Sequence, residues 1–576
     1  MSIRRLDDST INKIAAGEVI ERPAAVVKEL IENSLDAGAR RIEVKLDSGA
    51  IVVTDDGSGM SPDDLTLAVE RHATSKIRAV EDLGRLDSYG FRGEALPAIA
   101  AVSDLTLRSR RESDEAGSNL HIVGGATASS GQEPMAAGTI VEVRRLFFNT
   151  PVRSKFLKTE RTERQRMVAA VERLALGRPD VAFRCTLDGR LVLATPGGAD
   201  YRQALLAVYG VDTARAVSIC SSADQAGRRV DALVGGPSTA RGDRRLQGVW
   251  INSRPVLSRG LLEAANNAYP LGLTPGRGYP LIHLHVHVPP ADVDANVHPT
   301  KAEVRLAATA ELLALVVRAV RAVQSGDGVT TTTPTAAETA PARPARPGTG
   351  TGRPDGLAMP PGAPEGQYVA ETPAAWRFGT GVLGELRPLG QSGFSWIVCD
   401  GPGGLYLIDQ HAAHERVLYE QLSAGGGDGQ ATQLLAVPQP VELTASEHLT
   451  WQEGQAELAL AGLRTEDFGG RTVLVRGVPA TLLAGGVDGT SLLREVLAAL
   501  ANEQTRHSAL RPELQARRAV ASCAAAVKAS SRLAPTELQG LLDALRRCQE
   551  PLRCPHGRPT IICLRHEELA GRFGRT

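Results

Sequence analysis

Residues 23–37 read PAAVVKELIENSLDA, and the rest of the chain is organised around this short stretch. Glu29, Asn33 and Asp36 are spaced i, i+4 and i+7, so a helix of 3.6 residues per turn places them on one face. Leu30 and Ile31 fall on the opposite side, which suits packing against a sheet. A carboxylate, an amide and a second carboxylate in register can hold a hard cation and a water molecule beside a phosphate. A solvated helix face can carry the same pattern, so the choice between a solvated face and a phosphate site depends on the neighbouring motifs.

Composition limits the classes of protein to consider. A chain of 576 residues predicts about three or four domains. Lys+Arg and Asp+Glu both number 65, so any contact with nucleic acid must come from local basic patches. We expect no membrane span and no apolar leader, because long uncharged apolar runs are missing. Seven scattered cysteines favour reduced thiols, so we expect a cytoplasmic protein.

A composition shift divides the chain in two. Between about residues 324 and 366 the sequence turns to Thr, Pro, Ala and Gly, with almost no large apolar side chains. Such a segment buries too little apolar surface to offset the entropy of ordering it. We therefore predict a disordered tether between an N-terminal and a C-terminal half.

Three further motifs follow the opening helix in the N-terminal half. Predicted strands at 41–46 and 51–54 lead into DDGSGM at 55–60, where Asp55 at a strand end can accept a hydrogen bond from an exocyclic amine. RHATSKI at 71–77 and GFRGEALP at 90–97 come next, and the latter places two glycines before a helical stretch, where free N–H groups can hold a polyphosphate. The spacing fits neither a P-loop nor a dinucleotide fingerprint. Gly138 and Thr139 then open another strand.

Together these elements resemble the GHKL ATPase family, which includes gyrase, histidine kinases and a class of heat-shock chaperones. Within that family the sequences of these motifs are similar to those of the MutL mismatch-repair proteins. The resemblance continues through LFFNTPVRSKFL at 146–157, INSRPV at 251–256 and VDANVHPTKAEVR at 293–305. It therefore covers essentially the whole first half.

The resemblance implies a role for each matching residue. Glu29 would be the general base for the attacking water, Asn33 would hold Mg²⁺ and Asp55 would read the adenine amine. Lys301, from a second domain, would reach the γ-phosphate. Asp36 would support the polar end of the helix. The full set of implied ATP contacts is Asn33, Asp55, Gly59, Thr74, Gly90, Phe91, Arg92, Gly93, Glu94, Ala95, Leu96, Thr139 and Lys301, with 90–96 as a lid. One departure is Asp56, where the family commonly has Asn.

Two other patterns in this half have more ordinary interpretations. Three histidines alternate along IHLHVH at 282–287, and we interpret them as a partly exposed strand face in preference to a metal site. Basic residues cluster twice and could contact the DNA backbone or form a solvated face. The clusters are Arg153, Lys155, Lys158, Arg161, Arg164 and Arg166, and then Arg241, Arg244, Arg245, Arg254 and Arg259.

The C-terminal half carries a possible metal site. Predicted strands at 393–399 and 404–409 deliver DQHAAHERVLYE at 409–420, and Cys523 and CPHGRP at 554–559 lie far downstream. Mixed thiolate, imidazole and carboxylate donors suit zinc or manganese. Alternatively, any one of these residues could be an ordinary buried core residue that binds no metal. The candidate ligands are Asp409, His411, Glu415, Cys523, Cys554 and His556.

This pattern resembles the MutL members whose C-terminal domain is a metal-dependent endonuclease. The resemblance implies that Asp409 and Glu415 are the catalytic or metal-bridging carboxylates, with two metals about 3.5–4 Å apart activating a water. Ala524 departs from the family, which often has a basic residue there. The stretch QLLAVP at 433–438 resembles a sliding-clamp-binding motif through Gln433, Leu435 and Pro438, although an ordinary strand leaving the core would also fit.

These inferences predict a multidomain α/β (α+β) chain. We expect a GHKL ATPase sandwich at 1–204, a ribosomal-protein-fold transducer domain at 205–325, a flexible linker at 326–372 and an α+β dimerisation and endonuclease domain at 373–576. A regulatory insertion would span about 438–510.

The expected function is that of a homodimeric ATPase and nicking endonuclease of DNA mismatch repair. It would use ATP, Mg²⁺ and, in the C-terminal half, Zn²⁺ or Mn²⁺ or both. Its expected partners are double-stranded DNA, the mismatch-recognition protein MutS and the replication sliding clamp, in the cytoplasm at the nucleoid. The alternative is an ATP-gated adaptor with only a structural zinc. A topoisomerase would need a strand-passing tyrosine domain that we do not find, and the nuclease motif disfavours a chaperone.

Overall fold

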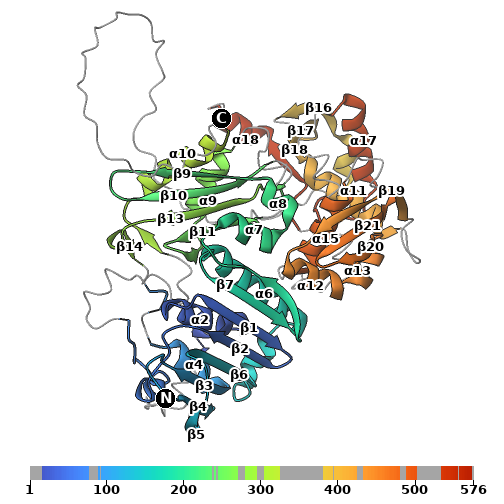
Figure 1. Ribbon diagram of the computed structural model, residues 1–576. Coiled ribbons are helices and arrows are strands. Elements are labelled where there is room, and N and C mark those ends of the chain that lie inside the picture. Colours follow the sequence, from blue (N-terminus) through green and yellow to red (C-terminus); the bar gives the residue numbers. More distant parts are fainter. Residues whose placement is uncertain are drawn as a thin grey trace, which may run out of the picture.

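The structure is a computed structural model of the 576-residue chain (Figure 1). It describes residues 16–17, 19–76, 88–90, 93–236, 239–241, 244–269, 279–294, 304–324, 380–392, 395–424, 432–480, 488–501, 533–555 and 557–573. The predicted tether, Phe91, Arg92, Lys301, Cys523 and His556 lie outside these ranges.

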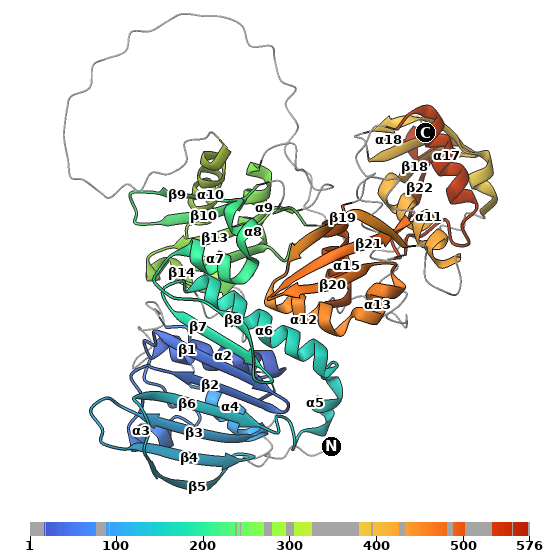
Figure 2. The ribbon, with the colours of Figure 1, turned by 45° about the vertical axis from the view of Figure 1, so that its right-hand side comes forward.

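The N-terminal unit is a sheet with helices packed on one face. Its eight strands run in the order β5-β4-β3-β6-β2-β1-β7-β8. Alternate residues of β1 and β3 are buried, so one face forms the core and the other meets solvent. Helices α2, α4 and α6 cover the buried face (Figure 2). The strands are β1 (Arg41–Asp47), β2 (Ala50–Asp55), β3 (Asp104–Arg110), β4 (Gly117–Val123), β5 (Ala126–Glu133), β6 (Gly138–Arg144), β7 (Ala182–Leu187) and β8 (Arg190–Ala194).

Helix α2 (Pro23–Asp36) confirms the prediction for the opening stretch. A proline occupies its first turn, where the missing N–H costs no hydrogen bond. Val27, Leu30 and Ile31 are buried in the core. Glu29 and Asn33 remain half-buried on the other face, so the helix holds its polar row at the edge of a packed core. The other helices of this unit are α3 (Pro62–Leu67), α4 (Ala95–Val102), α5 (Pro151–Phe156) and α6 (Glu160–Gly177).

A second unit follows, built on the five-stranded sheet β12-β11-β13-β10-β9. Helices α9 (Arg259–Ala268) and α10 (Thr309–Gln324) cover one face of this sheet. Its other elements are α7 (Tyr201–Tyr209), α8 (Val211–Arg215), β9 (Val217–Ala223), β10 (Arg229–Gly235), β11 (Gln247–Ile251), β12 (Arg254–Val256) and β13 (Ile282–His287), with the short strands β14 (Val293–Asp294) and β15 (Arg305–Leu306) beyond.

The expectation that the histidines of β13 lie on a partly exposed face is wrong for two of them. His283 and His285 are 1% and 2% exposed. Trp250 packs against both rings, with centroids at 4.9 and 4.8 Å. The hydroxyl of Tyr209 lies 3.2 Å from Nε2 of His283. Burial lowers the pKa of His285 to about 3 and that of His283 well below its ordinary value, so both are neutral aromatic core residues.

The C-terminal half contains two further sheets (Figure 1). The first, β16-β17-β18-β22, packs against α11 and α17. The chain leaves this unit after α11 and builds the second sheet, β19-β21-β20, which packs with α12, α13 and α15. It then returns through α17 and β22. The strands are β16 (Arg387–Ser392), β17 (Trp396–Gly401), β18 (Gly404–Asp409), β19 (Thr432–Glu442), β20 (Arg464–Gly469), β21 (Thr472–Pro479) and β22 (Ile561–Arg565).

The helices of this half begin with α11 (Gln410–Ala424), which carries the DQHAAHERVLYE motif on from Asp409 at the end of β18. The others are α12 (Ala445–Glu453), α13 (Gln455–Leu460), α15 (Gly489–Ala501), α17 (Pro535–Arg546) and α18 (His566–Arg572). Across the described residues of both halves, no helix combines the length and apolarity that crossing a bilayer requires.

Candidate functional site

Asp55 lies at the end of β2 with its carboxylate held from two sides. The hydroxyl of Ser34, on α2, donates to Oδ2 at 2.7 Å, and the N–H of Gly57 donates to Oδ1 at 2.9 Å. Only 9% of Asp55 is exposed, and burial raises its pKa although both hydrogen bonds act in the opposite direction. A carboxylate fixed in this way can accept from an amine that enters the site.

The neighbouring Asp56 has a different task. Its Oδ1 accepts from the backbone N–H groups of Arg40 and Arg41, at 2.7 and 2.8 Å. The carboxylate therefore ties the start of β1 to the end of β2. An asparagine at this position could accept the same two hydrogen bonds, so the departure at Asp56 leaves this connection intact.

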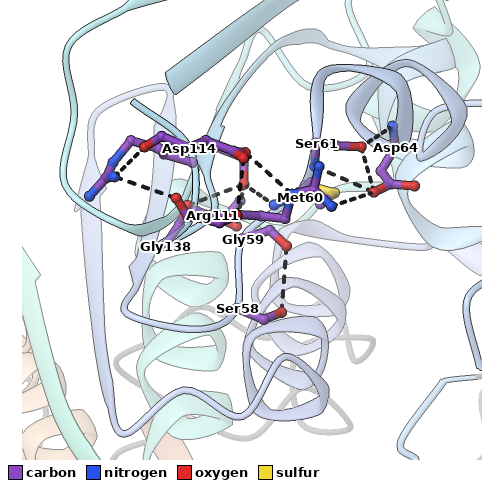
Figure 3. Close-up of polar contacts among 12 residues, drawn as sticks. Ser58, Gly59, Met60, Ser61, Asp64, Arg111, Asp114 and Gly138 are labelled. Atoms are coloured by element: carbon purple, nitrogen blue, oxygen red, sulfur yellow. Dashed lines mark hydrogen bonds and ion pairs between the residues drawn. The ribbon is translucent and has the colours of Figure 1, made fainter. Parts of the chain in front are cut away.

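The loop after Asp55 is fixed by short polar contacts (Figure 3). Gly59 has φ +66°, and a Cβ there would lie 2.2 Å from the carbonyl oxygen of Arg110. The N–H of Met60 donates to Oγ of Ser109 at 2.8 Å, and that hydroxyl lies 2.9 Å from Oγ1 of Thr139. Thr139 is directly opposite Asp55 in the pairing of β2 with β6. The structure thus brings Asp55, Gly59 and Thr139 together.

Asp36 and Asn33 gather around a lysine that the sequence analysis did not single out. Lys76 Nζ donates to Oδ1 of Asn33 at 3.0 Å and to Oδ2 of Asp36. Asp36 also accepts from the backbone N–H groups of Tyr89 and Gly90, at 2.7 and 3.1 Å. The expected supporting role of Asp36 is therefore specific: it joins α2 to both ends of the segment that precedes the lid.

Glu29 lies one turn before Asn33 on the same helix. Lys28 Nζ lies 3.0 Å from Oε1 of Glu29 and 3.0 Å from Glu32. Burial works against the charged ammonium, but the two carboxylates outweigh it and raise the pKa of Lys28. The lysine therefore stays charged beside the Glu29 carboxylate.

The described part of the lid passes against the segment around Ala73, where the His72 N–H donates to the Gly93 carbonyl oxygen at 3.3 Å. Gly93 has φ +61°, and a Cβ on it would lie 2.2 Å from the carbonyl oxygen of Ala73. Glu94 is the N-cap of α4, which begins with Ala95 and Leu96, and no side chain of the described residues caps the N–H groups of its first turn. This is the predicted arrangement of glycine before a helix start. Phe91 and Arg92 of the lid, and Lys301, lie outside the described residues.

The second unit touches the segment that precedes the lid. Arg254, from β12, donates to the carbonyl oxygen of Ser88 at 2.7 Å, and the Tyr89 hydroxyl donates to the carbonyl oxygen of Ser253 at 3.2 Å. Sequence reasoning placed Arg254 only in a basic cluster. No local pattern could have revealed these contacts, because about 165 residues separate the partners.

Asp409 ends β18 and begins the helix that carries the other two candidate carboxylate and imidazole ligands. Its Oδ1 accepts from the N–H of Ala412 at 3.0 Å. Glu415 is 2% exposed, and Nδ1 of His411 is buried with no hydrogen-bond partner among the described residues. Buried carboxylate and imidazole groups on one short segment are the donors that a transition metal requires.

Cys554 is buried in a tight turn that contacts α11. The turn is closed by a hydrogen bond from the N–H of Gly557 to the carbonyl of Cys554, at 2.8 Å. Arg416, on α11, donates to the carbonyl oxygen of Arg553 at 2.6 Å. Glu420 accepts from the N–H groups of Gln549 and Glu550 and so anchors the same region.

These contacts bring the chain around Cys554 to α11 but do not complete a ligand set. Cys523 and His556 lie outside the described residues, and within the described ranges no group of three or more His, Cys, Asp and Glu side chains could hold a metal ion.

The predicted clamp motif lies on β19, where the pairing with β21 shifts register between Leu434 and Gln439. Leu434 and Val437 are 64% and 76% exposed. Leu435 packs partly against the neighbouring core, whereas Gln433 is exposed and Pro438 is half-buried. The exposed apolar side chains are therefore those beside Leu435.

Several members of the basic clusters already have protein partners. Arg153 donates to the carbonyl oxygen of Ile20 at 3.0 Å, and Arg164 pairs with Glu160 and Asp188. Arg161 contacts the C-terminal half, as described below. These residues consequently do more than form a solvated basic face.

Comparisons with known proteins give concordant matches. Family models match at residues 21–140 (histidine kinase-, DNA gyrase B- and HSP90-like ATPase), 205–324 (DNA mismatch repair protein, C-terminal domain) and 389–533 (MutL C terminal dimerisation domain). The chain is 41% identical to the DNA mismatch repair protein MutL of Symbiobacterium thermophilum, with 100% of each chain covered. It is 43% identical to the protein of that name from Desulforudis audaxviator, with 100% of this chain and 99% of the relative covered.

Among solved structures, the Aquifex aeolicus MutL ATPase domain complexed with ADP is 30% identical, with a TM-score of 0.37, covering 47% of this chain and 94% of that chain.

Proposed function

The chain belongs to the MutL family of DNA mismatch repair proteins, and we propose that it hydrolyses ATP at α2 and nicks DNA with a metal centre in its C-terminal half. The observation that carries the ATPase part is the polar row of Glu29 and Asn33 on α2, the helix whose Ser34 hydroxyl donates to Asp55 at the end of β2. The nicking activity and its metal rest on the chemistry of the residues around Asp409.

In the proposed ATPase reaction, each residue acts through an atom described above. The Asp55 carboxylate accepts a hydrogen bond from the adenine amine, and the N–H groups at the start of α4 bind phosphate oxygens. Glu29 orients the attacking water and accepts its proton. Lys28, 3.0 Å from Oε1 of Glu29, would hold that carboxylate in place.

Magnesium fits the same site. The oxygens of Asn33 and Asp36 already surround one cation, the Lys76 ammonium, so they are aimed at a common point. Asn33 would hold the ion, whose charge would offset that of the phosphates. Lys76 would have to give up its contact with Asn33 for this to happen.

The proposed nuclease uses Asp409, His411, Glu415, Cys523, Cys554 and His556 to hold zinc or manganese. The buried Nδ1 of His411, which has no hydrogen-bond partner in the part of the chain that the structure describes, is consistent with an imidazole that binds a metal. When bound, such ions would supply an activated water and charge stabilisation for phosphodiester cleavage. Asp409, at the end of a strand and fixed by the Ala412 N–H, is placed to orient that water.

The remaining parts of the proposal concern partners and assembly. The match to a MutL dimerisation domain supports a homodimer. Double-stranded DNA, MutS and the sliding clamp are the proposed partners. The proposed localisation is cytoplasmic, at the nucleoid. For the clamp, the exposed Leu434 and Val437 beside Leu435 offer an extended apolar peptide. The unit built on β19, β20 and β21 is the proposed regulatory insertion.

Plasmid nicking tests the nuclease proposal. Wild-type protein with Mn²⁺ should relax supercoiled plasmid at low salt, and Asp409→Asn should lose at least about a hundredfold in rate, since one charged group at a metal centre contributes several kcal/mol. The matched control is Asp400→Asn, an exposed aspartate on the neighbouring strand β17, which should nick normally. Absence of nicking by the wild type, or equal nicking by Asp409→Asn, would favour the ATP-gated adaptor with a structural zinc.

A further inference from the structure

Helix α6 is the element through which the two halves of the chain meet. One side of α6 packs on α2, the helix that carries Glu29. Another side packs on α12 of the C-terminal half (Figure 2). Ala445 and Leu449 of α12 are 3% and 7% exposed and belong to the core of the N-terminal unit. The contact is thus between a helix next to the ATPase residues and a helix more than 270 residues away in sequence.

The two ends of α12 meet opposite charges on α6. At its N-terminus, the N–H and hydroxyl of Ser446 donate to the Glu172 carboxylate at 3.2 and 2.9 Å. At its C-terminus, the Arg161 guanidinium donates to the carbonyl oxygens of Thr450 and Glu453, at 3.0 and 2.8 Å. A helix is positive at its N-terminus and negative at its C-terminus. The Glu172 carboxylate, when ionised, and the Arg161 guanidinium therefore each offset the helix dipole at the end that they face.

Side chains reinforce this match at the C-terminal end. Arg161 also lies 3.0 Å from the Glu453 carboxylate and 3.7 Å from that of Glu457. Only 19% of the Arg161 side chain is exposed. Since its donors are turned toward α12, this arginine cannot contact a DNA phosphate while the helix is in place.

A second patch has the same arrangement of charged groups at helix ends, between different elements. The Glu442 carboxylate accepts from the N–H of Val211, the first residue of α8, at 2.7 Å. Arg471 donates to the carbonyl oxygens of Ala207 and Val208, at the end of α7, at 2.6 and 3.2 Å. An anion again faces a helix start and a cation faces a helix end.

The composition of the contact favours reversibility. Besides the apolar Ala445 and Leu449, the hydrogen bonds and ion pairs described above join charged and polar groups that water can also solvate. Gln165 lies between Arg161 and Glu172 on the same face of α6, is 5% exposed, and has neither amide atom hydrogen-bonded among the described residues. Separation would give this amide water partners, which a permanent interface would not require.

We propose that the Arg161–Glu172 face of α6 is a docking surface for α12, and that this contact is a reversible latch that holds the C-terminal half against the ATPase unit. With the latch closed, the C-terminal half is held beside the helix that packs on α2. With it open, Arg161 and its basic neighbours become available to other partners. The latch is a property of the chain itself and does not depend on either proposed catalytic activity.

Hydrogen exchange in the full-length protein tests the latch directly. The Ser446 N–H lies in the first turn of α12, where no intrahelical carbonyl is available, and Glu172 is its recorded acceptor. The Val211 N–H also lies in the first turn of its helix, α8, and reports the second patch. We would measure peptides containing each amide without nucleotide, metal or DNA.

Arg161→Ala should open the latch and accelerate exchange at both Ser446 and Val211 by about tenfold, because it removes the charge-assisted hydrogen bonds to the end of α12. The radius of gyration from X-ray scattering should rise. The control is Arg184→Ala, an arginine on β7 whose ion partner Glu43 lies in its own half. Arg471→Ala removes the hydrogen bonds of the second patch, from the C-terminal half, and serves as the test if Arg161→Ala does not fold.

Unchanged exchange at Val211 in both Arg161→Ala and Arg471→Ala would overturn the proposal, as would an unchanged radius of gyration. Loss of nicking or of ATP turnover would not bear on it, so the latch and the proposed function fail separately.

Discussion

At the scale of single residues, the ATP site shows which roles a sequence can reveal. Glu29, Asn33 and Asp55 lie where helix spacing and strand ends placed them, because both are local properties of the chain. Lys76 and Arg254 were not predicted as site residues, since their contacts with Asn33 and Ser88 depend on the fold. The presence of a lysine or arginine in a motif does not predict which residue will accept its hydrogen bonds.

Asp36 offers a test at this scale. Asp36→Ala removes the acceptor that holds Lys76 and the Tyr89 and Gly90 amides to α2. We expect ATP to bind about tenfold more weakly, since a lid that is not anchored must be ordered on binding. Calorimetric titration with a non-hydrolysable ATP analogue would measure this.

Asp56→Asn is the matched control for that titration, because an amide oxygen can accept from Arg40 and Arg41 as the carboxylate does. Its affinity should stay within about twofold of wild type. Equal affinity of Asp36→Ala and wild type would show that the anchor has no part in nucleotide binding.

At the scale of elements, β13 and α6 explain where the sequence interpretation failed. Alternating His and apolar residues in β13 look like a half-exposed strand, but helices cover one face and Trp250 and Tyr209 the other. Histidine can be buried when aromatic rings surround it. Here the rings come from other elements, so the alternation within β13 does not predict them. Helix α6 was predicted only as part of a basic cluster, because its polar residues serve contacts with several elements at once.

Glu172 on α6 predicts a pH dependence. Burial raises its pKa to about 7, although the two hydrogen bonds from Ser446 act in the opposite direction. Glu447 adds to the rise and Arg471 opposes it. Because the folded pKa lies above the ordinary value of 4.5, the stabilising contribution is fully present below 4.5 and is lost as pH rises through about 7.

The wild type should therefore have a higher melting temperature at pH 6 than at pH 8, relative to Glu172→Gln, whose amide does not titrate. Calorimetry of both proteins across that range gives the difference. Parallel melting curves at every pH would contradict the assignment to Glu172.

The lid crossing makes a second prediction for an element. Gly93→Ala would strain a residue with φ +61° and drive its Cβ to 2.2 Å from the Ala73 carbonyl oxygen. We expect ATP turnover to fall at least about tenfold, since the lid could not keep its path over the site. Gly131→Ala on β5, where a Cβ would meet only Asn119 at 3.5 Å, should leave turnover unchanged. Normal turnover by Gly93→Ala would show that this crossing is not needed.

At the scale of the whole molecule, composition indicated two halves but not their contact. The Thr- and Pro-rich segment at 324–366 is visible as a change in residue types. The docking of α12 on α6 is not visible, because Glu172, Ser446 and Arg161 are ordinary surface residues until both helices are in place. Contacts between distant polar residues leave no periodic signal.

Salt should weaken this contact. Raising NaCl from about 0.1 M to about 1 M shortens the Debye length from roughly 10 Å to roughly 3 Å and screens the charges at the ends of α12. The wild type should then expand in X-ray scattering, whereas Arg161→Ala should already be expanded and change little. A wild-type radius of gyration that is independent of salt would argue against an electrostatic latch.

The ATP site on α2 is the centre of the proposed function, and its most direct test is the separation of binding from hydrolysis in Glu29→Ala. We expect this variant to bind ATP with nearly wild-type affinity, because Asp55, Asn33 and the α4 N-terminus are untouched. Its release of phosphate should fall at least about a hundredfold, since general-base catalysis contributes about 10²–10⁴-fold. Phosphate release at the wild-type rate by a Glu29→Ala protein that binds ATP normally would contradict the assignment of Glu29 as the base.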